Sequence, residues 1–208
     1  MPRGKFITFE GIECAGKSTQ VGILCDFLKS QGIKVCQTRE PGGTQLADAL
    51  RGLLTDQSYD IPPTCELLMM FAARAAHVEQ LINPALEAGS WVICDRYVDA
   101  SYAYQGAGRG FNDEVIAYLD QLTTQGLHPD VTFLLDLPIN KMVSRMNARV
   151  DKPDRIELED VNFFQQVSDK YLERAQVFSD RYEVIDALLP VGYIESQMIE
   201  ALKIRGYL

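Results

Sequence analysis

Residues 11–18 combine the residue types and the spacing that bind polyphosphate. The pattern G-x-x-x-x-G-K-[ST] is matched at every fixed position by the segment Gly11-Ile12-Glu13-Cys14-Ala15-Gly16-Lys17-Ser18. Main-chain N–H groups bind most of a polyphosphate, and the two glycines permit the turn that points these groups inward. Lys17 would place a positive charge on the β- and γ-phosphates, and the Ser18 hydroxyl would hold the Mg²⁺ that bridges them. The segment therefore predicts a nucleotide-binding loop, but it does not specify a reaction.

Other polar side chains follow later apolar runs. The run from Trp91 to Asp95 ends in a carboxylate of the kind that commonly serves the metal side of a phosphate site, and Arg96 comes next. In an open α/β sheet, ligands collect beyond the carboxyl ends of the strands. Arg39 follows an earlier run in the same way, although the glycine- and proline-rich turn after it is also typical of a plain chain reversal. We therefore expect Asp95 and Arg96 to lie at the site.

A dense cluster of charges follows two further arginines, Arg145 and Arg149. Residues 151–157 read Asp-Lys-Pro-Asp-Arg-Ile-Glu, a composition that is usually a solvated surface turn. Arginines that close over a transferring phosphate are a recurrent device, and a phosphate loop is already present in this chain. We therefore favour a mobile lid over about residues 142–157.

Apolar runs alternate with helical patterns along the chain. Strands are predicted at residues 6–9, 33–37, 91–95, 131–136 and 182–186. Helices are predicted after the phosphate loop, after residue 44, from 63 to about 88, at 113–125, over the segment with the two arginines, at 161–179 and from about 191. The glycines at 106, 108 and 110 predict a loop. This alternation predicts an α/β fold, a parallel sheet with helices on both faces.

The composition bounds the class of protein. At 208 residues and 47% hydrophobic, the chain is expected to form one domain over residues 1–208. The net charge of −9 argues against a nucleic-acid polymer or an anionic membrane as a partner. Five scattered cysteines argue against a disulfide framework or a zinc site. No apolar run approaches the ~18 residues of a membrane span, so a cytoplasmic location is expected.

Five segments, in this order, are highly specific. They are FEGIECAGKST at 9–19, TREPGGT at 38–44, ELLMMFAAR at 66–74, DRYVDASYAYQGAGRG at 95–110 and DRIE at 154–157. With them, the chain resembles the bacterial thymidylate kinases along essentially its whole length. The resemblance implies a nucleoside monophosphate kinase fold, with a five-stranded parallel sheet in three layers, a phosphate loop and a lid. It also implies γ-phosphoryl transfer from MgATP to dTMP, which gives dTDP and ADP for dTTP synthesis, usually in a homodimer.

The resemblance assigns the donor side of the site to the phosphate loop and the lid. ATP is implied to contact Gly11, Ile12, Glu13, Cys14, Ala15, Gly16, Lys17, Ser18, Thr19 and Arg145. The implied metal positions are Ser18 and Asp95, and the implied catalytic residues are Lys17, Glu13, Arg96 and Arg149. Residues 12–15 contain no arginine, so the lid is expected to supply the catalytic cation. The lid is one residue longer than the common pattern, so either of its arginines could reach the transferring group.

On the acceptor side, dTMP is implied to contact Arg51, Met70, Phe71, Arg74, Arg96, Ser101 and Gln105. Arg74 matches the arginine that reads a thymine carbonyl, and its apolar surroundings also require a buried partner. The family usually has an aromatic residue at the position of Met70 to stack on the base, so either Met70 or Phe71 takes that contact. The resemblance further implies a cis peptide bond between Glu40 and Pro41.

Other proteins with such a loop are less consistent with the sequence. A GTP-dependent switch would need N-K-x-D and D-x-x-G, but residues 140–143 fail at the last position and no D-x-x-G occurs. Another nucleoside monophosphate kinase or a deoxynucleoside kinase is the remaining alternative, and Arg51 and Arg96 favour an acceptor that already bears phosphate. That phosphate is ionised, so the reaction needs positioning and charge neutralisation rather than a strong general base.

Cys14 is the one cysteine inside the phosphate loop. The other four, Cys25, Cys36, Cys65 and Cys94, lie in sequence contexts that predict buried, inert thiols. A maleimide is therefore predicted to modify Cys14 first and to block the donor phosphates.

Overall fold

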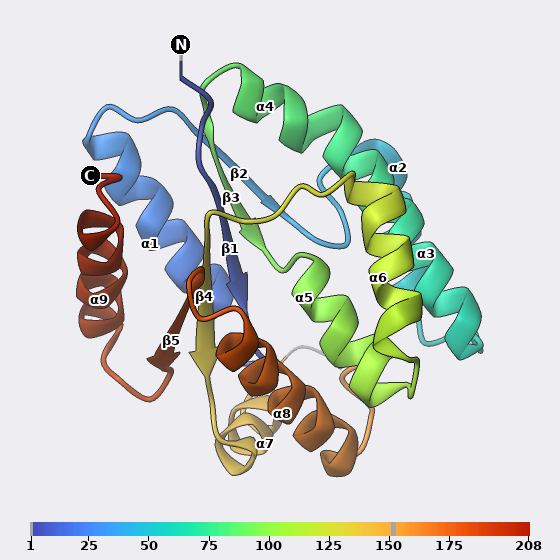
Figure 1. The fold of residues 1–208 in the computed structure, drawn as a ribbon. Helices are drawn as coiled ribbons and strands as arrows, with labels where there is room; N and C mark the ends of the chain where they lie inside the picture. The colour runs from blue at the N-terminus through green and yellow to red at the C-terminus, as the bar shows by residue number, and fades with distance from the viewer. Residues whose placement is uncertain (1, 151–152) are drawn as a thin grey trace.

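The structure, a computed structural model, describes residues 2–150 and 153–208. In this part of the chain, five parallel strands form one sheet in the order β2-β3-β1-β4-β5 (Figure 1). The strands are β1 (Phe6–Glu10), β2 (Val35–Arg39), β3 (Trp91–Asp95), β4 (Val131–Asp136) and β5 (Tyr182–Asp186). The parallel sheet confirms the predicted α/β class.

Helices cover both faces of this sheet. Figure 1 shows α1 (Lys17–Ser30) and α9 (Val191–Ile204) together on one side. The opposite side carries α3 (Pro63–His77), α4 (Asn83–Glu87), α5 (Val98–Ser101), α6 (Asp113–Thr124) and α8 (Val161–Val177). The remaining two are α2 (Gln45–Thr55), which packs on α3, and α7 (Ile139–Asn147), which packs on α8. Among the described residues, no helix is long and apolar enough to cross a membrane.

Alternate residues of β1 and β3 belong to two different hydrophobic clusters. Ile7 and Phe9 of β1 join the cluster that contains Leu24 of α1, whereas Phe6 joins the one that contains Phe71 of α3. This separation follows from the two-residue period of a strand, which sends successive side chains to opposite faces. The clusters anchor the strand that leads directly into the phosphate loop.

Two predicted boundaries differ from the structure. β2 begins at Val35 rather than at residue 33, because the N–H of Ile33 donates to the carbonyl of Leu28 in the turn that ends α1. The long helix predicted from 63 to 88 is interrupted by a π-helical segment, Val78–Ile82, just before Pro84. Proline has no N–H to donate to the preceding turn, so the regular α-helical pattern changes at this point.

The loop predicted around the glycines at 106 and 108 is mostly helical. α5 continues into a π-helical segment, Tyr102–Gly108, whose last residue packs under α8. A Cβ atom at Gly108 would lie 2.5 Å from the ring of Phe163. This glycine therefore serves close packing between helices rather than a flexible turn.

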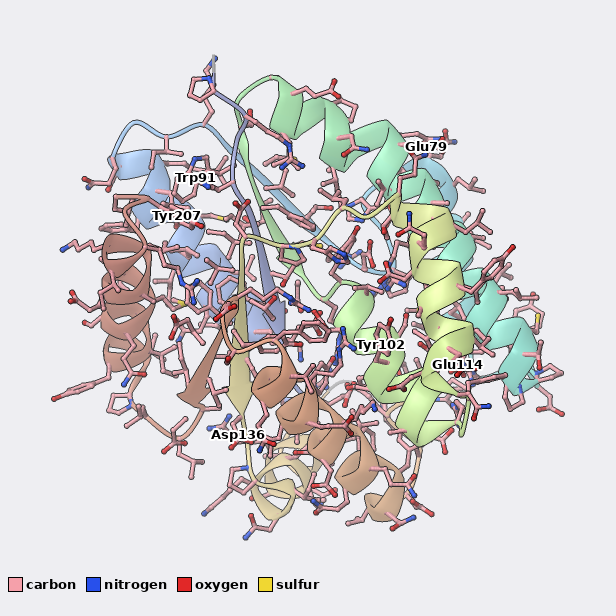
Figure 2. All side chains as sticks on the ribbon, viewed as in Figure 1. Glu79, Trp91, Tyr102, Glu114, Asp136 and Tyr207 are labelled. Atoms are coloured by element: carbon pink, nitrogen blue, oxygen red, sulfur yellow. The ribbon has the colours of Figure 1, made fainter. Side chains whose placement is uncertain are left out.

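The C-terminal tail closes over the amino ends of the strands. Trp91, the first residue of β3, and Tyr207 make an edge-on contact with ring centres 6.4 Å apart (Figure 2). The Nζ atom of Lys5 lies 3.9 Å from the centre of the Tyr207 ring. These contacts occupy the end of the sheet opposite to the candidate site.

Candidate active site

A cavity of about 570 Å³ opens beyond the carboxyl ends of β1, β2 and β3. The predicted site residues that line it are Glu13, Cys14, Gly16, Lys17, Ser18, Thr19, Arg51, Met70, Asp95, Arg96, Gln105, Arg145 and Arg149. The predicted residues that are not in its lining are Gly11, Ile12, Ala15, Phe71, Arg74 and Ser101. The lining thus joins the phosphate loop, the lid segment and α3, which lie far apart in the sequence.

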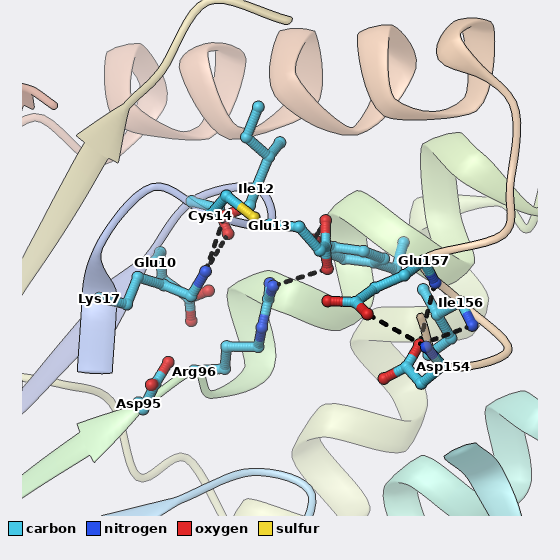
Figure 3. A network of polar contacts seen from close by, with 12 residues as sticks. Glu10, Ile12, Glu13, Cys14, Lys17, Asp95, Arg96, Asp154, Ile156 and Glu157 are labelled. Carbon is cyan, nitrogen blue, oxygen red and sulfur yellow. Dashed lines mark hydrogen bonds and ion pairs between the residues drawn. The ribbon is translucent and has the colours of Figure 1, made fainter. Parts of the chain in front are cut away.

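Lys17 occupies the first position of α1, directly after the loop. Gly16 takes a left-handed conformation with φ 94°, as the tight turn requires. The Nζ atom of Lys17 donates to the carbonyl oxygens of Gly11 at 3.0 Å and of Ile12 at 2.8 Å (Figure 3). Burial and the nearby Arg96 lower the pKa of Lys17 to about 8. The ammonium group is thus held back against the loop, at a site where a phosphate would favour its charged form.

Ser18 and Asp95, the two predicted metal positions, are in direct contact. The Oγ atom of Ser18 donates to Oδ2 of Asp95 at 2.6 Å. Mg²⁺ prefers oxygen ligands and is commonly held by one or two side chains together with phosphates and water. A hydroxyl and a carboxylate fit such a site. The described residues contain no cluster of three or more His, Cys, Asp or Glu side chains, so the other ligands would come from the nucleotide and water.

The backbone at Arg96 is left-handed, with φ 73°. A residue other than glycine in this region costs on the order of 1–3 kcal/mol and needs fixed surroundings. Two hydrogen bonds fix the backbone here. The N–H of Arg96 donates to the carbonyl of Phe9 at 2.9 Å, and the N–H of Tyr97 donates to Glu10 at 2.7 Å. The buried strand β1 therefore holds the strained turn that aims Arg96 at the cavity.

The guanidinium of Arg96 is fixed by three side chains from other elements. It donates to Glu13 at 2.9 Å (Figure 3) and to the hydroxyl of Tyr171 at 3.2 Å, and it lies 4.7 Å from the centre of the Tyr104 ring. Burial opposes the charge, but Tyr104, Tyr171 and Glu13 raise the pKa of Arg96 well above its usual value. Arg96 is therefore a permanent positive charge at the centre of the cavity.

Arg74 has the buried partner that its apolar helix requires. Its Nε donates to Glu40 at 2.8 Å, and its terminal nitrogens donate to Ser101 at 2.9 Å and to the carbonyl of Tyr97 at 3.1 Å. The Phe71 ring packs 4.8 Å from the guanidinium and lies in the core, whereas Met70 lines the cavity. The arrangement places Met70, not Phe71, on the ligand side of α3.

The bond between Glu40 and Pro41 is cis, as predicted. The Pro41 carbonyl accepts a hydrogen bond from Arg51 of α2 at 3.0 Å. Burial and the like charge of Arg39 lower the pKa of Arg51. Arg39 and Arg51 thus form a second group of cations in the lining of the cavity, beside Arg96.

The two lid arginines make different contacts. Arg145 donates to the carbonyls of Cys14 at 2.9 Å and Ala187 at 3.2 Å, so it is bound to the main chain. Arg149 pairs with Glu157 at 2.5 Å and lies 3.9 Å from the sulfur of Cys14. Residues 151–152 of the predicted lid lie outside the described residues. Arg149 is therefore the lid cation held mainly by another lid side chain.

Several residues that organise the site carried no signal of their own in the sequence. Glu10 supports the Arg96 turn, Glu40 pairs with Arg74, and Tyr104 and Tyr171 enclose Arg96. Glu10, Glu40 and Tyr104 all lie within the quoted segments at 9–19, 38–44 and 95–110, so their positions there could have marked them. Tyr171 lies in a helix remote from every motif, and only the fold brings it to the site.

Comparison with known proteins gives one consistent result. A family model described as thymidylate kinase matches residues 9–198. The chain is similar to the thymidylate kinases of Chromohalobacter salexigens, with 50% identity over 90% of this chain and 89% of that one, and of Alkalilimnicola ehrlichii, with 46% identity over 97% and 94%. It is also similar to the crystal structure of thymidylate kinase from Ehrlichia chaffeensis, with TM-score 0.79, 32% identity, and 97% and 99% of the two chains covered.

Proposed function

The chain belongs to the thymidylate kinase family, and we propose how its cavity carries out the reaction. The protein is a phosphotransferase of nucleotide biosynthesis that moves the γ-phosphoryl group of ATP to dTMP, giving dTDP and ADP. The observation that carries the proposal is one cavity lined by cations from separate elements. Lys17 of the loop and Arg145 and Arg149 of the lid segment line it together with Arg39, Arg51 and Arg96.

ATP binds with its phosphates on the loop from Gly11 to Thr19. Lys17 leaves the two carbonyl groups that it now contacts and neutralises the β- and γ-phosphates. Ser18 and Asp95 would hold Mg²⁺, which would supply further positive charge to the phosphates. Arg145 and Arg149 close over the donor, and the closed lid excludes water that would otherwise hydrolyse ATP.

The monophosphate of dTMP binds between Arg51 and Arg96. Its ionised oxygen is the nucleophile, so no residue needs to remove a proton. Glu13 fixes Arg96 and lies near the acceptor sugar and phosphate, so it positions the attack rather than acting as a base. Met70 and Gln105, which line the cavity, contact the thymine base, and the buried Arg74 and Ser101 would reach it only by a shift on binding. Residues 12–15 of the loop contain no arginine, so Arg149 supplies a second cation, beside Lys17, to the transition state.

ADP formation from ATP tests this function directly. The acceptors dTMP, dUMP, CMP, GMP, AMP and unphosphorylated thymidine are offered separately at equal concentration. We expect dTMP to be used most efficiently and thymidine not at all, because Arg51 and Arg96 require an acceptor phosphate. Efficient use of thymidine would support a deoxynucleoside kinase instead, and preference for AMP or GMP would contradict the base assignment.

We also propose a homodimer formed through the outer face of α2, α3 and α6. Leu46, Leu53, Leu68, Val115, Tyr118 and Leu122 are large apolar side chains on these packed helices, and all are exposed. Apolar side chains gathered in this way are typical of an interface between copies. Analytical ultracentrifugation should show a dimer that Tyr118→Asp converts to monomer.

The five cysteines are free thiols, which supports a reducing, cytoplasmic location.

A further inference from the structure

Glu66, in the first turn of α3, is a buried carboxylate that accepts hydrogen bonds from three side chains. Its Oε1 accepts from Gln105 at 2.9 Å and from Arg109 at 3.2 Å. Its Oε2 accepts from Arg109 at 3.0 Å and from Arg155 at 2.6 Å. Burial alone would raise the pKa of Glu66, but these donors hold it below its usual value. The group is therefore ionised at neutral pH and can only accept hydrogen bonds.

This partner determines which way the amide of Gln105 faces. An amide has a donating nitrogen and an accepting oxygen, and a carboxylate partner requires the nitrogen. The Oε1 atom of Gln105 then remains, and it is buried without a partner among the described residues. Gln105 is 1% exposed and lines the same cavity as Met70. An unpaired buried acceptor is unfavourable, and a ligand N–H in the cavity would satisfy it.

We propose that Glu66 sets the base specificity of the enzyme by holding Gln105 with its oxygen available to accept the N3–H of thymine. The inference rests on the proposed function, because it requires the base of dTMP to lie in this part of the cavity. Thymine and uracil both carry hydrogen on N3, whereas cytosine has a lone pair there. A fixed acceptor would thus reject dCMP and would not distinguish dTMP from dUMP.

Glu66 also joins α3 to Arg109 and to Arg155 of the lid segment, so a purely structural role must be separated from this one. Loosening these contacts would lower kcat/KM for every acceptor by a similar factor. Loss of a fixed amide would instead change the ratio between acceptors. The ratio is therefore the measurement that a structural role would not move.

The experiment measures kcat/KM for dTMP, dUMP and dCMP in the wild type, Glu66→Gln and Glu159→Gln. Glu159 pairs with the same Arg109 at 2.6 Å but does not contact Gln105, so its variant is the matched control. In Glu66→Gln, the partner can donate as well as accept, and the amide of Gln105 can rotate. We expect the preference for dTMP over dCMP to fall by about tenfold or more, with the preference over dUMP unchanged. The control should keep both preferences.

A second variant covers the case in which Glu66→Gln does not fold. Glu66→Asp keeps the negative charge beside the arginines and withdraws the acceptor from Gln105, so the dTMP preference over dCMP should fall in the same direction. An unchanged preference in the folded variants would overturn the inference. If Gln105→Ala alone lost the preference, Glu66 would be only structural. If the wild type did not phosphorylate dTMP, the proposed function itself would fail.

Discussion

The two sides of the cavity are built in opposite ways. On the base side, Arg74 and Glu40 are almost completely buried, with 0% and 2% of their side chains exposed, and each has fixed partners. On the phosphate side, the side chain of Arg149 is 41% exposed and is held mainly by a lid carboxylate. The proposed base side is thus fixed in the folded protein, whereas the proposed phosphate side combines the fixed Arg96 with the more exposed Arg149, which can move when the nucleotide arrives. Recognition and chemistry are therefore expected to respond differently to substitution.

The sharpest test of this contrast is stability. Glu40→Gln leaves Arg74 as a buried charge without its partner and should lower the free energy of unfolding by about 3–5 kcal/mol. Glu157→Gln removes the partner of the more exposed Arg149 and should lower it by less than about 1 kcal/mol. Urea denaturation of both variants provides the comparison. Equal losses would show that the lid pair is as much a part of the folded core as the Arg74 pair.

For the catalytic rate, unlike stability, the exposed lid arginine should matter strongly. If Arg149 neutralises charge in the transition state, Arg149→Ala should lower kcat by about 10²–10³ and leave the KM for dTMP nearly unchanged. Its melting temperature should stay close to that of the wild type, because its ion pair is partly exposed. Arg145→Ala, which tests the other arginine of the lid segment, is measured beside it. A raised KM at unchanged kcat would reassign Arg149 to substrate binding and make Arg145 the catalytic candidate.

The pKa of Lys17 predicts how ATP binding depends on pH. Burial holds this pKa at about 8 in the free protein, whereas phosphate favours the charged form. Affinity for ATP should therefore be full below pH 8 and fall by up to about tenfold per pH unit above it. Calorimetry in two buffers of different ionisation enthalpy should detect proton uptake on binding at pH 8.5. Lys17→Arg, which stays charged, should bind without that uptake.

The last test concerns the thiols, and one prediction about them requires correction. Cys14 lines the cavity, and Cys25 and Cys94 are buried as predicted. Cys36 is only partly buried, and Cys65 is exposed on the first turn of α3, so burial does not make Cys65 inert. The maleimide labelling experiment is therefore carried out on the Cys65→Ser variant. In that background, we expect maleimide to modify Cys14 first and to abolish activity, and MgATP to protect more than dTMP does. Mass spectrometry showing fully labelled Cys14 with activity retained would contradict it.

The sequence predicted the parts of the site that depend on local pattern. The phosphate loop, the strand ends at Asp95 and the need for a partner near Arg74 all follow from residue type and spacing. The identity of that partner does not, because Glu40 reaches Arg74 only through the pairing of β2 with β3 and the packing of α3. The helical path around Gly108 was missed for a related reason. Glycine is needed at position 108 because the ring of Phe163, from a distant segment, packs against it.

The sharing of Glu66 among three donors has a consequence for how this site can evolve. Gln105, Arg109 and Arg155 come from separate stretches of the chain, yet each depends on the same carboxylate. Substitutions at these positions should therefore be non-additive, and a double-mutant cycle between Glu66 and any of them should show coupling. A substitution of Glu66 that changed the base preference by releasing Gln105 would also remove the partner of Arg109 and Arg155. Evolutionary substitution of Glu66 is therefore constrained by epistasis with these three residues.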